Sequence, residues 1–142
     1  RKLKIEAAMR GANTIYLMDQ KTEGNVWNAF PGAGHNAYTN LSGIAYTNKL
    51  LNYSEFKNKI GSTTEFNVDK EYIMKKTRGD LETKPSKSIL SILEIIEENG
   101  FIYIVGKIND VKRKFLISRF DNSSFGIYYE DEEYNRYFEL SF

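Results

Sequence analysis

Apolar residues in the second half of the chain are spaced as antiparallel strands require. If residues 99–100 (Asn-Gly) form a two-residue hairpin turn, Ile95 lies opposite Ile104 in the ladder. The same register places Leu93 opposite Gly106. The pattern therefore predicts a β-hairpin around this turn.

A second two-residue turn, at residues 109–110 (Asn-Asp), extends the hairpin to a three-stranded meander. It places Ile108 opposite Val111. Further along the ladder, Ile104 lies opposite Phe115. Side chains alternate between the two faces of a strand, so both turns are tested by whether they agree on one apolar face. That face collects Ile89, Leu93, Ile95, Ile102, Ile104, Ile108, Val111, Phe115 and Ile117.

Residues 86–98 also allow a helix. Four apolar side chains in this segment recur at helical spacing, and residues 99–100 would then form the C-terminal cap. Agreement of two independent turns on one apolar face favours strands, and the helix stays open as the alternative.

The first fifty residues predict a helix and two strands. Apolar residues before Gly11 recur at near-helical spacing, and this glycine supplies a C-terminal stop. Residues 14–17 are β-branched, aromatic or apolar and predict a strand, and residues 40–48 predict a second one. Between them, residues 19–38 are rich in Gly, Pro and Asn, which is typical of a long loop or of a strand pair with a mobile tip.

The same patterns organise the rest of the chain. They predict a short helix over 52–60, one or two strands over 64–77, a polar connection over 78–88 and a final hairpin of 125–130 with 136–142. The predicted fold class is α+β, with a short N-terminal helix packed on a small sheet, followed by a larger antiparallel β meander or barrel-like sheet. We expect parts at 1–50 and 51–142, which can also form one continuous domain.

Composition and charge exclude several kinds of chemistry and argue against some partners. The chain has 142 residues and no cysteine, which excludes thiolate catalysis, Cys-ligated zinc, iron–sulfur clusters and disulfides. No apolar run approaches the roughly 18 residues of a membrane span. The net charge of +1 argues against a general polyanion-binding protein. Beneath that balance, the middle of the chain is basic and residues 130–133 form an acidic run.

Few residues suggest catalysis. His35 is the only histidine, in a glycine-rich segment at residues 30–36, and a hydrolase that uses it is one alternative function. The segment lacks the Lys-Ser/Thr pair of a phosphate-binding loop, and His35 has no companions at metal-ligand spacing. We therefore expect a non-enzymatic protein that holds no metal and no cofactor.

Aromatic residues suggest binding. Trp27 lies in a polar segment, where an exposed Trp would anchor a partner or ligand and a Trp folded back under its loop would not. The chain has ten Tyr and nine Phe, and aromatic side chains of its β-rich half could also stack on bases. A single-stranded nucleic-acid-binding β-barrel is therefore a second alternative function. Its candidate residues are Tyr103, Tyr128, Tyr129, Tyr134 and Tyr137. Aromatic residues that simply fill a sheet face explain the same composition.

Residues 5–20 (IEAAMRGANTIYLMDQ) and 37–49 (AYTNLSGIAYTNK) carry a family resemblance. The chain resembles, over about residues 3–49, small bacterial envelope lipoproteins of the Rcs stress-sensor kind and related periplasmic domains. Those proteins carry disulfide cysteines that this chain lacks, and its β-rich half has no counterpart in them. The matching positions are Gly11, Ala12, Asn13, Ile15, Leu17, Gly43, Ala45 and Tyr46.

The resemblance implies a setting in the cell envelope. We expect a non-enzymatic protein of the periplasm or outer membrane, held to the membrane only through a lipid anchor upstream of Arg1. Its partner would be another envelope protein or a small ligand rather than a nucleic acid. The candidate binding residues are Trp27, Phe30, His35 and Tyr38.

Overall fold

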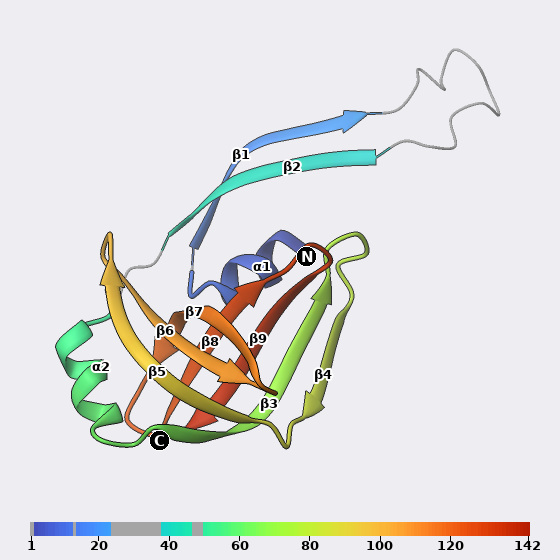
Figure 1. Cartoon of the computed structure of the whole chain (residues 1–142). Coiled ribbons are helices and arrows are strands. Elements are labelled where there is room, and N and C mark those ends of the chain that lie inside the picture. The colour runs from blue at the N-terminus through green and yellow to red at the C-terminus, as the bar shows by residue number, and fades with distance from the viewer. Residues whose placement is uncertain (1, 13, 24–37, 47–49) are drawn as a thin grey trace, which may run out of the picture.

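A computed structural model describes residues 2–12, 14–23, 38–46 and 50–142, with side chains for 2–12 and 50–142. These residues form two short helices and a sheet-dominated fold (Figure 1). The helices are α1 (Lys2–Met9) and α2 (Tyr53–Ile60). The strands are β1 (Thr14–Glu23), β2 (Tyr38–Tyr46), β3 (Glu65–Lys75), β4 (Leu81–Pro85), β5 (Ile89–Glu98), β6 (Phe101–Ile108), β7 (Val111–Phe120), β8 (Ser124–Glu130) and β9 (Tyr134–Ser141).

The larger sheet is antiparallel and closes on itself. Its order is β4-β3-β5-β6-β7-β8-β9, and an additional pairing joins β3 to β9. Residues 65–67 of β3 pair with β5, whereas residues 68–75 pair with β9. β3 therefore closes the sheet by pairing with both β5 and β9. The predicted larger antiparallel or barrel-like sheet is confirmed. The helical share is smaller than an α+β description suggests.

Both predicted hairpin turns are present. Asn99 and Gly100 have positive φ angles of 53° and 82°, and Asn109 and Asp110 have 53° and 63°, as expected where two-residue turns match the strand twist. Residues 86–98 accordingly contain a strand and not a helix, because β5 begins at Ile89.

One bulge changes which residues of β5 face inward. Gly106 pairs with Ile92 and not with Leu93, because the register shifts between Ile92 and Glu94. The extra residue reverses the inward alternation before the bulge. Leu90 is therefore fully buried, whereas Leu93 is 56% exposed. The predicted apolar face is correct for Ile102, Ile104, Ile108, Phe115 and Ile117, which are buried, and for Ile95, which packs against the core. Val111 also lies on this face but is 49% exposed, whereas Ile89 and Leu93 are exposed and the prediction is wrong for them.

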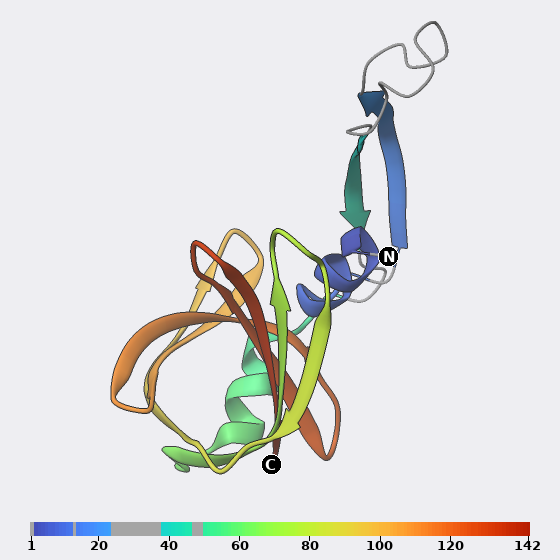
Figure 2. The same cartoon turned by 90° about the vertical axis from the view of Figure 1, so that its right-hand side faces the viewer.

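The helix α2 covers one end of the closed sheet and inserts two side chains into its interior. The Asn52 side chain caps it by accepting a hydrogen bond from the Glu55 backbone N–H at 2.9 Å. Its apolar side places Phe56 and Ile60 in the same core cluster as Phe120 and other inward side chains of the strands. Figure 2 shows α2 against the opening of the sheet.

The polar connection predicted over residues 78–88 contains a strand. β4 pairs with β3 from Leu81 opposite Met74 to Pro85 opposite Lys70. All five of its residues are exposed, so no alternation of apolar and polar side chains marks this strand in the sequence.

The N-terminal helix packs on the larger sheet, which corrects the prediction of a small sheet beneath it. Met9 lies in a cluster with Met74 and Tyr128 on the outer face. β1 and β2 pair with each other as a ribbon that projects away from the larger sheet (Figures 1 and 2). The strand-pair alternative for this region is therefore correct over its described residues. Neither described helix has the length and hydropathy to cross a membrane.

Candidate functional site

The four candidate binding residues cannot be placed in a common site. Trp27, Phe30 and His35 lie outside the described residues. Tyr38 begins β2, opposite Glu23 of β1, and the structure describes its backbone only. The side chains that do line a pocket come from other parts of the chain.

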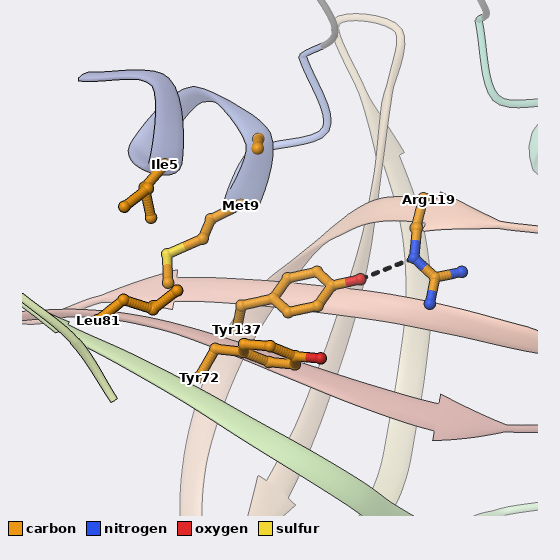
Figure 3. Close-up of a pocket in the computed structure, with 7 residues that line it drawn as sticks. Ile5, Met9, Tyr72, Leu81, Arg119 and Tyr137 are labelled. Atoms are coloured by element: carbon orange, nitrogen blue, oxygen red, sulfur yellow. Dashed lines mark hydrogen bonds between the residues drawn. The ribbon is translucent and has the colours of Figure 1, made fainter. Parts of the chain in front are cut away.

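A pocket of about 360 Å³ lies between α1 and the outer face of the larger sheet (Figure 3). One wall is the helix, and the facing wall comes from four different strands. The pocket is lined by Ile5, Ala8 and Met9 of α1, Tyr72 of β3, Leu81 of β4, Arg119 of β7 and Tyr137 of β9. Most of these side chains are apolar or aromatic, as in typical small-molecule sites.

Two glycines shape this pocket. A Cβ on Gly126 would lie 1.9 Å from the Tyr137 hydroxyl oxygen, so the absence of a side chain lets the Tyr137 ring lie close over β8. A Cβ on Gly11 would lie 2.2 Å from the Ser118 carbonyl oxygen, so this glycine lets the end of α1 approach β7. The Ser118 hydroxyl in turn donates a hydrogen bond to the Met9 carbonyl.

At the polar end of the pocket, two carboxylates balance the positive charge of Arg119. The Arg119 guanidinium lies 3.4 Å from a Glu139 carboxylate oxygen and 3.6 Å from an Asp121 oxygen. Tyr72 donates a hydrogen bond to the other Glu139 oxygen at 3.1 Å. With two carboxylates beside it, Arg119 does not offer a free positive charge to an anionic ligand.

Tyr137 provides a hydrogen-bond donor at this end. Its hydroxyl oxygen accepts a hydrogen bond from Arg119 Nε at 2.8 Å (Figure 3), which leaves its own proton for another acceptor. Burial raises the pKa of Tyr137 above its usual value, despite the opposing effect of Arg119. The hydroxyl therefore keeps its proton at neutral pH.

The tyrosines proposed as a base-stacking surface do not share one face. Tyr128 and Tyr137 lie on the outer face and pack in the cluster around Met9. Tyr129 instead packs against the interior core. Tyr137 is among the candidates from the sequence, but no sequence signal joins it to α1, because that contact depends on the tertiary fold.

The described residues contain no group of three or more His, Cys, Asp or Glu side chains that could hold a metal ion. No protein-family model, curated protein or solved structure matches this chain.

Proposed function

We propose that this is a non-enzymatic binding protein whose pocket between α1 and the larger sheet takes a small, neutral, mainly apolar molecule with one hydrogen-bond acceptor. The observation that carries the proposal is an apolar cavity with a single polar end. Ile5, Ala8, Met9 and Leu81 would contact the body of the ligand. The Tyr137 hydroxyl would donate to its acceptor, such as a ketone oxygen.

Charge supports a neutral ligand. Glu139 and Asp121 already balance Arg119, so an anion would meet two carboxylates near the guanidinium. A cation would meet the guanidinium itself and apolar side chains that cannot solvate it. A neutral acceptor avoids both costs and satisfies the Tyr137 proton.

Binding of the neutral fluorescent naphthalene ketone prodan tests this function. Prodan emission depends on polarity and hydrogen bonding, so its titration with protein should give a saturable, blue-shifted signal. Replacing Ala8 by Phe fills the pocket and should weaken prodan binding by at least about tenfold. Replacing Tyr137 by Phe removes the donor alone and should weaken it by roughly threefold to tenfold, the usual range for one hydrogen bond.

Lys4→Phe is the matched control for the first variant. Lys4 is an exposed residue of the same helix and does not line the pocket, so it adds the same ring elsewhere. This control should bind prodan as the unmodified chain does. Equal affinities of the Ala8→Phe and Lys4→Phe proteins would exclude the pocket as the binding site.

We also propose that the protein works in the cell envelope as a lipoprotein of the periplasm or outer membrane. This proposal is supported by the sequence resemblance over about residues 3–49. Fractionation of cells that produce the full-length protein tests it, because a lipid-anchored protein should be recovered with membranes and released by detergent. Recovery with cytoplasmic proteins would contradict the envelope location and leave the pocket proposal intact.

A further inference from the structure

A second cavity, of about 210 Å³, lies inside the closed sheet at the end away from α2. α2 packs Phe56 against Phe120 at the last residue of β7, with ring centroids 5.2 Å apart. The cavity is lined instead by Val111, Arg113 and Phe115 from the first half of that strand. This cavity is thus separate from the pocket under α1, which lies on the outer face.

The floor of the cavity is aromatic. The rings of Phe115 and Tyr129 meet edge to face with centroids 5.4 Å apart, and those of Tyr129 and Phe138 stack at 5.9 Å. Phe115 and Phe138 both belong to the buried core. Phe115 is fully buried and Phe138 is 3% exposed, so a ligand in the cavity would touch Val111 and Tyr129, which keep accessible surface, rather than these two rings.

The wall of the cavity holds an ion-pair network. Arg136 Nη1 lies 3.1 Å from a Glu71 oxygen, and the other Glu71 oxygen lies 3.8 Å from Lys84 Nζ. Glu71 and Arg136 keep only 14% and 24% of their side-chain surface exposed. Their low exposure makes the charge balance of the cavity matter more than that of a surface pair.

Arg113 adds a positive charge to this network. Its guanidinium carbon lies 4.4 Å from the centroid of the Tyr129 ring, a cation–π contact. Among the described residues it forms no ion pair. Stacking occupies the face of the guanidinium and leaves its in-plane N–H groups able to donate to a ligand.

Arg136 has an unused donor on the same wall. Its Nε atom is buried and has no hydrogen-bond acceptor among the described residues. Asp131 lies 3.5 Å from it, within ion-pair distance but without hydrogen-bond geometry. A buried donor without an acceptor is unfavourable, but this atom has no accessible surface, so the Arg136 side chain would have to turn before a ligand acceptor could relieve that cost.

We propose that this cavity binds a small organic monocarboxylate, with its carboxylate on Arg113 and its apolar body against Val111 and Tyr129. The side chains that line the cavity or pair with its lining carry three positive charges, on Lys84, Arg113 and Arg136, and two negative charges, on Glu71 and Asp131. One carboxylate neutralises the excess charge. A planar carboxylate also matches the paired N–H groups of a guanidinium.

An NMR titration with benzoate tests the proposal. The Nε–H signals of Arg113 and Arg136 are followed directly, because both should shift when a carboxylate arrives. Benzoate should bind with a Kd of about 1 mM or lower. Benzamide, which lacks the charge, and acetate, which lacks the ring, should each bind at least about tenfold more weakly.

Arg113→Gln should weaken benzoate binding by at least about tenfold. Lys112→Gln is its matched control, because Lys112 is the exposed neighbour and loses the same charge. Benzoate binding should be unchanged in that control and in the Ala8→Phe protein, which separates this site from the pocket under α1. Equal binding of benzoate and benzamide, equal effects of the two Gln variants, tighter binding of inorganic phosphate, or no saturable shift would each overturn the proposal.

Discussion

Replacing Phe56 by alanine should lower the free energy of unfolding by about 3–5 kcal/mol. Phe56 is fully buried, and its ring lies 5.2 Å from Phe120 and 5.7 Å from Phe125 between centroids. The substitution would leave a large void between α2 and these rings, because strands held in a closed sheet cannot collapse into it. Urea unfolding followed by circular dichroism measures the loss.

Phe101→Ala removes the same atoms from an exposed position and is the control. Phe101 is 53% exposed at the start of β6, so its replacement should change the free energy of unfolding by less than about 1 kcal/mol. Similar losses in the two variants would show that α2 does not insert Phe56 into the core.

Replacing Gly11 by alanine should lower the free energy of unfolding by about 2–4 kcal/mol, from two causes. Gly11 has φ of 90°, which disfavours any residue with a side chain. Its new Cβ would also meet the Ser118 carbonyl oxygen at 2.2 Å, and that backbone atom cannot rotate away. We expect the end of α1 to move off β7, so prodan binding should weaken together with stability.

Gly100→Ala separates the two causes. Gly100 has a similar φ of 82°, and a Cβ there would meet nothing within 4 Å. This control should lose only about 1–2 kcal/mol of unfolding free energy and should bind prodan normally. If both variants lose the same stability and keep the same prodan affinity, the close approach of α1 to β7 is wrong.

In the meander of β5, β6 and β7, local sequence patterns were enough to predict the strand pairing but not the bulge. Two-residue turns and alternating side chains are properties of neighbouring residues, so they predicted the pairing of Ile95 with Ile104 and of Ile108 with Val111 correctly. The bulge at Leu93 was not predicted, because no residue type in β5 marks it. Its one extra residue reverses which side chains of β5 face inward before the bulge.

The two cavities were less accessible to prediction. Arg113 and Glu71 lie far apart in the chain, and nothing in their spacing indicates that β3 and β7 bring them to one cavity. The pocket under α1 likewise joins Ala8 to Leu81 and Tyr137. Trp27 and His35 stand out in the sequence because each is the single residue of its type, whereas common residues form sites only when the fold assembles them.

The strands of the meander, the two hairpin turns and the short helix over 52–60 follow from the sequence, because each depends on residues within one or two turns of chain. The absence of cysteine chemistry follows from composition. Closure of the sheet through β3 and β9, the exposed strand β4 and the docking of α1 were decided only by the tertiary structure. Each of these joins residues whose mutual contact no local pattern specifies, and both proposed binding sites are built from such contacts.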